Sequence, residues 1–325
     1  MASITLLHLT VVVLCVTAGA VRPGFSHGAA EHHPRSVYLD MGANWANTLR
    51  LFKDITPAEH HNDKWEVYAF EANPIIQSYV EKFVNYLNGG GEKPPITVPP
   101  SGSTAHLFSY AADFGCPTKS GADQMRECMW KVFEKPLAAL APNPKLNSSE
   151  LVQQRLAEAK TPLDLAANRS RFTFVPAAVG AVEGWLHLGA TDPGQAIRGG
   201  AAITNSKSAM SVISTDVVSW MVENFSEDDY VVVKMDVEGA EFDILDSLQR
   251  AGKLGLIDLL AMECHGWSVN SFLTRKPDSQ LRDCSKVAGL LEEHHVPVMV
   301  EGRGYQGFDS ESTPELFKPL DPRSV

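Results

Sequence analysis

Apolar runs of strand length alternate with amphipathic segments of helical length along most of this 325-residue chain. The strand-like runs are bounded by Gly, Pro or charged residues, whereas the helical segments carry apolar residues three and four positions apart. Strands are expected at residues 36–45, 65–74, 171–180, 184–190, 230–236 and 256–266, and a final hairpin at 296–302 and 304–309. Helices are expected at residues 47–52, 74–87, 122–140, 148–159, 216–225, 238–252 and 281–295.

This alternation places the chain in the α/β class, with a mostly parallel sheet and helices on both of its faces. The hydrophobic content of 44% is enough for a substantial core. Ligands of such sheets bind beside the carboxyl ends of the strands, where the direction of winding reverses. The polar side chains that follow each strand are therefore the candidates for function.

The N-terminal segment 1–20 is mostly apolar and holds no charged side chain. It ends in Ala18-Gly19-Ala20, small residues that suit signal peptidase, so we expect a signal peptide that is cleaved after Ala20. A single-pass membrane anchor and another organelle-targeting peptide are the alternatives. The further boundaries that we expect are a flexible lead-in, one domain and a polar tail at residues 21–34, 35–310 and 311–325.

The net charge of −11 makes the chain a poor partner for nucleic acids, whose phosphates require clustered Lys and Arg. Three Asn-x-Ser sequons, at Asn147, Asn168 and Asn224, are candidate glycan acceptors in a secreted protein. With the N-terminal segment, they favour a location in the secretory pathway, in the lumen of the endoplasmic reticulum or Golgi or outside the cell.

One of the five cysteines, Cys15, falls in the expected signal peptide. The remaining four, Cys116, Cys128, Cys264 and Cys284, can form two disulfides in a secreted chain. Cys116 and Cys128 are close in sequence and are the first expected pair. Four unpaired buried thiols are the alternative, and the spacing fits no zinc motif.

The first two strands end in acids. Asp40 precedes a turn through Gly42 and Asn44, and Glu71 follows the second strand. Asp40 would repel a pyrophosphate, whereas an acid at the place of Glu71 accepts ribose hydroxyls in nucleotide-binding sheets. A phosphate-free adenosyl ligand with an amino-acid tail, such as S-adenosylmethionine, suits both acids. Structural roles, a turn Asp and an exposed Glu, are the alternative.

The run YVVVKMDVEGAEFDIL places a lysine inside an apolar strand and four acids after it. Side chains alternate along a strand, so Lys234 and Asp236 point the same way and can pair, and Glu238 joins them if the strand continues that far. Asp236 then lies at the carboxyl end of the strand, beside Asp40. Glu238 and Glu241 fall in the first turn of the next helix, where acids stabilise the dipole, and Glu241 is expected at the surface.

The following strand ends in Glu263-Cys264-His265, at the same edge of the sheet as Asp236. A histidine near its ordinary pKa accepts a proton from a hydroxyl, and a carboxylate beside it orients the ring. A structural histidine is the alternative. Asp236, Glu263 and His265 could also hold a divalent ion that lowers the pKa of a hydroxyl, but nothing in their spacing requires one, so no metal is assigned.

Together these stretches resemble the FkbM-type S-adenosylmethionine-dependent methyltransferases. The resemblance rests on YLDMGAN, VYAFEANP, FVPAAVG and VKMDVEGAEFDIL followed by MECH, and it covers residues 36–80 and 170–308. The Lys-x-Asp-x-Glu-Gly-x-Glu run is its most specific part. The resemblance implies a Rossmann-like sheet of seven strands, S-adenosylmethionine as cofactor, and methyl transfer to a hydroxyl of a glycan or small metabolite.

The resemblance also implies roles for individual residues. Methyl transfer is an in-line displacement in which the protein aligns the acceptor oxygen and removes a proton. Asp236 lies at the reacting centre and His265 is the expected base. The cofactor is assigned to Asp40, Gly42, Asn44 and Glu71, and the catalytic centre to Lys234, Asp236, Glu263 and His265.

Two departures from the family pattern leave alternatives open. The family has glycine where this chain has Ala46, and the largely helical segment 89–171 has little counterpart, so we interpret it as an inserted lid or substrate-recognition element. A secreted binding protein that keeps the fold but has lost catalysis is the main alternative. A nicotinamide-dependent oxidoreductase requires a G-x-G-x-x-G fingerprint that the first turn lacks.

Overall fold

The structure is a computed structural model of the chain. It describes residues 34–46, 49, 56, 58–60, 62–92, 94, 116, 124, 128, 143–164, 169–189, 202–203, 210–265 and 284–300. The expected signal peptide, the polar tail and the second strand of the final hairpin lie outside these residues. So do almost all residues of the expected helices at 47–52 and 122–140.

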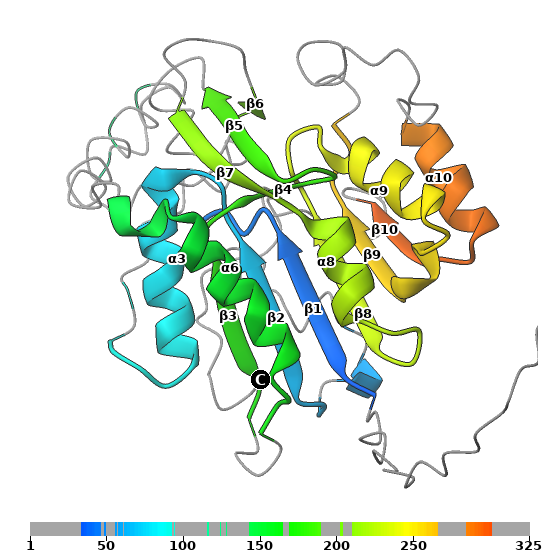
Figure 1. The fold of residues 1–325 in the computed structure, drawn as a ribbon, viewed down its shortest axis with the longest axis horizontal. Helices are drawn as coiled ribbons and strands as arrows, with labels where there is room; N and C mark the ends of the chain where they lie inside the picture. The colour runs from blue at the N-terminus through cyan, green and yellow to red at the C-terminus, as the bar shows by residue number, and fades with distance from the viewer. Residues whose placement is uncertain are drawn as a thin grey trace, which may run out of the picture. The chain divides into compact units, whose positions relative to one another are not determined.

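The central sheet of the described residues has six strands in the order β10-β9-β8-β1-β2-β3, and all its pairings are parallel (Figure 1). The strands are β1 (Ser36–Met41), β2 (Trp65–Phe70), β3 (Arg171–Val175), β8 (Tyr230–Met235), β9 (Leu259–Met262) and β10 (Val298–Val300). The winding reverses between β1 and β8, the place where such sheets bind ligands. The expected α/β class is confirmed, with six strands described in this sheet where the resemblance implies seven.

A second sheet has the order β4-β7-β5-β6. Its strands are β4 (Ala178–Gly180), β5 (Gly184–Gly189), β6 (Ala202–Ile203) and β7 (Met210–Asp216). The single strand expected at 171–180 is therefore wrong, because it divides at Pro176 between the two sheets. Proline has no N–H for a sheet ladder, so the pairing of β3 with β2 stops before Pro176.

Helices cover both faces of the central sheet. The helices are α3 (Pro74–Leu87), α6 (Ser149–Ala157), α8 (Val217–Asn224), α9 (Glu241–Arg250) and α10 (Cys284–Glu293), with short 3-10 turns η1 (Ala58–His60), η2 (Pro144–Leu146), η3 (Glu158–Lys160) and η5 (Leu254–Leu256). Val37 and Leu39 of β1 pack in one core cluster with α6, α8, α9 and α10, whereas Tyr38 packs in another with α3. This alternation along β1 is that of a strand buried on both sides.

The end of the expected insertion belongs to the core. Ser148 caps α6 by accepting a hydrogen bond from the N–H of Leu151, and α6 lies on the sheet beside α8 (Figure 1). Val152 and Leu156 are buried in the same cluster as β1, and Trp220 of α8 donates from Nε1 to the carbonyl oxygen of Leu156 at 3.0 Å. Residues 149–160 are therefore a sheet-covering element, and the lid interpretation applies only to the earlier part of the insertion.

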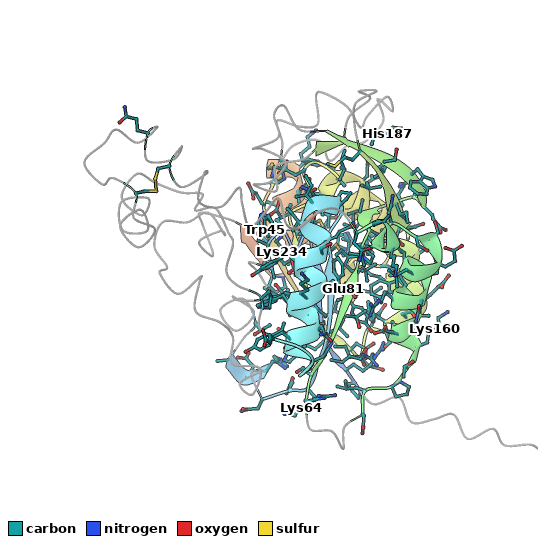
Figure 2. All side chains as sticks on the ribbon, turned by 90° about the vertical axis from the view of Figure 1, so that its left-hand side faces the viewer. Trp45, Lys64, Glu81, Lys160, His187 and Lys234 are labelled. Carbon is teal, nitrogen blue, oxygen red and sulfur yellow. A yellow bond between two sulfur atoms is a disulfide. The ribbon has the colours of Figure 1, made fainter. Side chains whose placement is uncertain are left out.

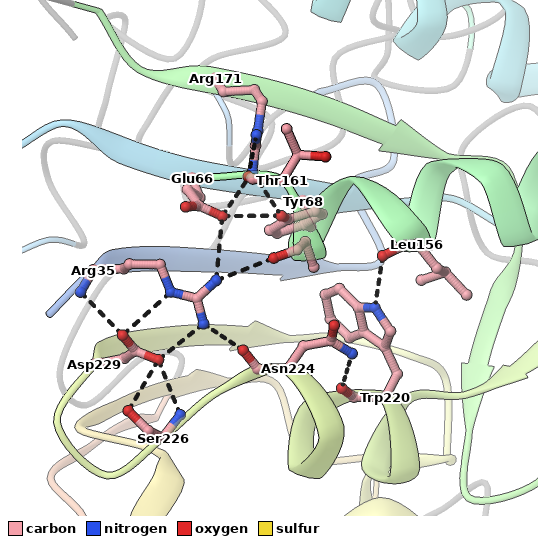
Figure 3. Close-up of polar contacts among 11 residues, drawn as sticks. Arg35, Glu66, Tyr68, Leu156, Thr161, Arg171, Trp220, Asn224, Ser226 and Asp229 are labelled. Carbon is pink, nitrogen blue, oxygen red and sulfur yellow. Dashed lines mark hydrogen bonds and ion pairs between the residues drawn. The ribbon is translucent and has the colours of Figure 1, made fainter. Parts of the chain in front are cut away.

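A buried polar network joins the amino-terminal ends of the strands (Figure 3). Arg35 binds both carboxylate oxygens of Asp229, at 3.3 Å from Nε to Oδ1 and 3.0 Å from Nη2 to Oδ2. It also donates to two main-chain carbonyl oxygens and lies 3.7 Å from Glu66, which Arg171 binds at 2.8 Å. Burial together with the charge of Glu66 raises the pKa of Tyr68 far above its usual range. This end of the sheet is thus held by ion pairs between buried or partly buried side chains.

Two disulfides join the four cysteines outside the expected signal peptide. The expected pair Cys116–Cys128 is confirmed, and the second bond, Cys264–Cys284, ties the end of β9 to the first residue of α10. Disulfides persist in oxidising compartments, with which the two bonds are compatible. In the part of the chain that the structure describes, no helix has the length and apolar character needed to cross a membrane.

Candidate active site at the carboxyl edge of the sheet

Lys234 lies inside the fold near the end of β8, with 1% of its side chain exposed (Figure 2). Its Nζ donates to the carbonyl oxygen of Gly42 and lies 3.3 Å from Oδ2 of Asp236 and 3.7 Å from Oδ1 of Asp40. Burial lowers the pKa of Lys234, but the charges of Asp236 and Asp40 outweigh burial and hold the pKa above its ordinary value. The lysine is tolerated in an apolar strand because it joins two strand ends.

The turn after β1 packs directly on the end of β8. Gly42 has a φ of +89°, and a Cβ built on it would lie 1.9 Å from the carbonyl oxygen of Asp236. The N–H of Asp236 donates to the carbonyl oxygen of Met41 at 3.0 Å. Any side chain at position 42 would therefore separate the two strand ends, which explains the glycine.

Glu71 is buried at the end of β2 and braces the turn against α3. Its Oε2 accepts the N–H of Asn44 at 2.8 Å, and its Oε1 accepts the N–H of Asn73, the N-cap of α3, at 2.6 Å. Burial raises the pKa of Glu71 to about 7, against the effect of these hydrogen bonds. Each carboxylate oxygen keeps a second lone pair that a ligand hydroxyl can use.

His265 is held by a buried carboxylate of the next helix. Its Nδ1 lies 2.7 Å from Oε1 of Glu241, which also accepts the N–H of Val237 at 3.0 Å. Glu241 is fully buried, so the expectation that it lies at the surface as a helix-dipole residue is wrong. Glu241 is the first residue of α9, and from that position its side chain reaches His265.

The other ring nitrogen of His265 faces three more carboxylates. Nε2 lies 3.4 Å from Glu263, 3.8 Å from Glu238 and 3.9 Å from Asp236. Burial lowers the pKa of His265, but hydrogen bonds and charge from Glu241 and Glu263 outweigh it and raise the pKa to about 11. The ring is therefore a positively charged imidazolium at neutral pH when no other cation lies beside Nε2.

The structure thus brings most of the residues expected from the sequence to one edge. Lys234 contacts Gly42 and Asp236, and His265 connects Asp236 with Glu263. Asn44 and Glu71 contact each other one strand further along. Glu238 was expected in the first turn of the next helix, but α9 begins at Glu241, so that placement is wrong. Glu238 precedes the helix with a φ of +54°, a conformation uncommon for a residue other than glycine, and its carboxylate joins the cluster.

Negative charge exceeds positive charge at this edge. Two cationic side chains face five carboxylates: Lys234 and His265 against Asp40, Asp236, Glu238, Glu241 and Glu263. Such a surrounding disfavours a phosphate or pyrophosphate and favours a cation or a ligand with a cationic end. The arrangement can bind a positively charged group and accept protons from a hydroxyl.

Ala46 occupies a backbone conformation that favours glycine. Its φ is +58°, in the left-handed region, and its side chain is fully buried. For a residue with a Cβ this conformation costs roughly 1–2 kcal/mol. The strain lies two residues after Asn44, in the turn that the resemblance assigns to the cofactor.

Comparison with known proteins does not assign the chain to a family. The chain has no significant match among protein-family models, curated proteins or solved structures.

Proposed function

We propose that this chain is an S-adenosylmethionine-dependent O-methyltransferase that acts on a hydroxyl of a glycan or small metabolite in the secretory pathway. The observation that carries the proposal is the convergence of three strand ends, those of β1, β8 and β9, on the acidic edge around Lys234 and His265. Parallel sheets bind their ligands at this edge. The motif resemblance and the strand order, whose winding reverses beside β1, also support it.

The chemistry of the edge fits the cofactor. S-adenosylmethionine supplies a methyl group on a positively charged sulfur, and the excess of carboxylates favours that charge. Asp40 and Gly42 form the turn at the methionine end, where Lys234 holds the main chain of Gly42. Glu71, held by the N–H groups of Asn44 and Asn73, accepts the ribose hydroxyls with its remaining lone pairs.

The acceptor hydroxyl requires a proton acceptor beside it. His265 was expected to be the base, but both of its ring nitrogens face carboxylates, so it is better suited to hold those carboxylates in place. We assign proton removal to Glu263, whose side chain is 39% exposed at the end of β9. Asp236 lies between Lys234 and His265 and aligns the acceptor.

The strained Ala46 favours a second candidate, a secreted binding protein on the same fold. The family that the chain resembles has glycine at this position, and here a buried alanine holds a left-handed conformation in the turn proposed to bind the cofactor. Cofactor binding without methyl transfer is the behaviour that this candidate predicts.

Cofactor binding tests the proposal directly. Isothermal titration of the purified protein with S-adenosylmethionine and S-adenosylhomocysteine is expected to give micromolar affinity. Glu71→Ala is expected to weaken binding at least tenfold, about 1.4 kcal/mol, because the ribose hydroxyls lose their acceptor. Glu227→Ala, which changes an exposed glutamate, is expected to bind as the wild type does.

Thermal unfolding of each variant separates lost binding from lost folding, since Glu71 also braces the main chain. The absence of cofactor binding by folded wild-type protein would refute the methyltransferase proposal. Binding of S-adenosylmethionine without its conversion to S-adenosylhomocysteine in the presence of any hydroxylated acceptor supports the binding-protein candidate instead.

The two disulfides support the proposed location, and the folded structure distinguishes the described sequons. Asn147 is exposed after η2, and its Nδ2 has one long contact, 3.4 Å from the carbonyl oxygen of Ser211. Nδ2 of Asn224 donates to the carbonyl oxygen of Trp220 at 2.7 Å, and its Oδ1 is buried. A glycan fits on Asn147 and would disrupt α8 on Asn224. Asn168 lies outside the described residues.

We therefore expect that secreted protein carries a glycan on Asn147 and none on Asn224. Asn147→Gln should remove one glycan, so the undigested variant should migrate faster on a gel than undigested wild type. After glycosidase treatment the two proteins should migrate together. Asn224→Gln should leave the mobility unchanged. Loss of a glycan in the Asn224→Gln protein would show that α8 is not folded as described when the chain is modified.

A further inference from the structure

We propose that Asp236, Glu263 and His265 form a binding site for one divalent first-row metal ion, with Mn²⁺ and Zn²⁺ as the ions that suit it. The three residues stand at the ends of the neighbouring parallel strands β8 and β9. One donor atom of each, an imidazole nitrogen or a carboxylate oxygen, lies within 4.8 Å of the other two. Glu238 brings a fourth donor oxygen to 3.8 Å from Nε2 of His265.

The separations of these donors match the edges of a metal coordination shell. Donors bound about 2.1 Å from a tetrahedral ion lie roughly 3.4 Å from one another. Nε2 of His265 lies 3.4 Å from Oε1 of Glu263 and 3.9 Å from Oδ1 of Asp236. Charge-assisted hydrogen bonds are shorter, about 2.7–2.9 Å, which is the length of the bond on the other ring nitrogen.

Glu241 supplies an independent feature of metal sites. A histidine that binds a metal with one nitrogen almost always gives its other N–H to a carboxylate or carbonyl, which fixes the tautomer. Glu241 holds Nδ1 in this way from a fully buried position, and its Oε2 has no hydrogen-bond partner among the described residues. A solvated acidic patch needs no buried carboxylate behind the histidine. A metal ion bound to Nε2 would balance the negative charge of the buried Glu241.

The donor set selects the class of ion. Imidazole with carboxylates suits Mn²⁺ or Zn²⁺, whereas Ca²⁺ and Mg²⁺ favour oxygen ligands alone. Cys264 lies between two of the ligands in sequence, but its disulfide with Cys284 removes it as a thiolate ligand. Three protein ligands leave positions open, as in catalytic sites. If the proposed methyl transfer holds, an open position can take the acceptor hydroxyl and lower its pKa. Glu263 would then bind the ion through one carboxylate oxygen and accept the proton with the other.

Metal binding can be measured without cofactor or acceptor. The purified protein is titrated with Mn²⁺, and free ion is followed by electron paramagnetic resonance. We expect one ion per chain and a rise in melting temperature with added Mn²⁺. Glu263→Gln is expected to weaken binding at least tenfold. Glu241→Gln, which alters the support of His265, should weaken it about 10–100-fold.

Glu227→Gln is the matched control, since this exposed glutamate pairs with Lys253 on the surface. Metal binding by this variant should equal that of wild type. Unchanged affinity in Glu263→Gln would place the ion elsewhere and overturn the proposal. Failure of folded wild-type protein to bind millimolar Mn²⁺ or Zn²⁺ would also overturn it. Neither result depends on methyl transfer, so the two proposals fail separately.

Discussion

Replacing Lys234 with methionine is expected to lower the free energy of unfolding by about 3–5 kcal/mol, the usual cost of removing one member of a buried ion pair. Methionine fills a similar volume, so packing changes little. The loss comes from Asp40, which is fully buried and no longer faces a cation, and from the carbonyl oxygen of Gly42, which loses its donor. The change in free energy of unfolding is measured by urea denaturation, with circular dichroism as the signal.

The matched control is Lys253→Met, because Lys253 pairs with Glu227 at 3.4 Å on the surface. Exposed pairs contribute about 0–1 kcal/mol, so this variant should be nearly as stable as wild type. The double variant Asp40→Asn, Lys234→Met should lose less than the sum of its single changes, since the two sites share one interaction. Equal losses of stability in Lys234→Met and Lys253→Met would contradict the role of Lys234 in joining the ends of β1 and β8.

Arg35→Leu is expected to destabilise the fold by about 3 kcal/mol or more, from the opposite edge of the sheet. The change removes the guanidinium that binds the buried carboxylate of Asp229 in a bidentate manner. It also removes the donors to two main-chain carbonyl oxygens (Figure 3). Burial raises the pKa of Asp229, but hydrogen bonds from Arg35 and from the N–H of Ser226 outweigh burial and hold the pKa below its ordinary value.

The sign of that pKa shift gives a second readout. A carboxyl group with a lowered pKa in the folded state stabilises the protein above its unfolded pKa, and this stability is lost as the pH falls through the folded value. Wild type should therefore lose stability below about pH 4 more steeply than Arg35→Leu does. Arg250→Leu, at an exposed pair with Asp246, should change stability by only about 0.3–0.5 kcal/mol. Identical acid profiles of Arg35→Leu and wild type would contradict the role of Arg35.

Hydrophobic periodicity predicts the central sheet and its helices well, because each strand and helix carries its pattern locally. The helix expected at 74–87 is found at those residues, with Asn73 as its cap. The second sheet was predicted poorly. β7 was missed, although its run Val212-Ile213 is β-branched, and β4 was joined to β3 across Pro176. The pairing of short strands depends on partners far along the chain, which periodicity does not report.

The candidate site was predicted where strand ends carry unusual residue types, as at Lys234 and His265. It was not predicted where the role depends on three-dimensional contact. Glu241 looks like any acid in a first helical turn, and only the fold shows that its carboxylate is buried against the imidazole. The protonation of His265 likewise follows from four carboxylates converging from separate segments, a sum that no local pattern contains.

The Cys264–Cys284 disulfide links oxidation of the chain to the position of the site residues beside Cys264. The bond closes the segment between Cys264 and Cys284, a separation of 20 residues, and anchors the residue that lies between Glu263 and His265. A loop of about this size lowers the entropy of the unfolded chain by the equivalent of roughly 3 kcal/mol. Newly made protein is therefore expected to hold Cys264, and with it the end of β9, in place only after Cys264 and Cys284 are oxidised. Assembly of the candidate site would then depend on the redox state of the compartment.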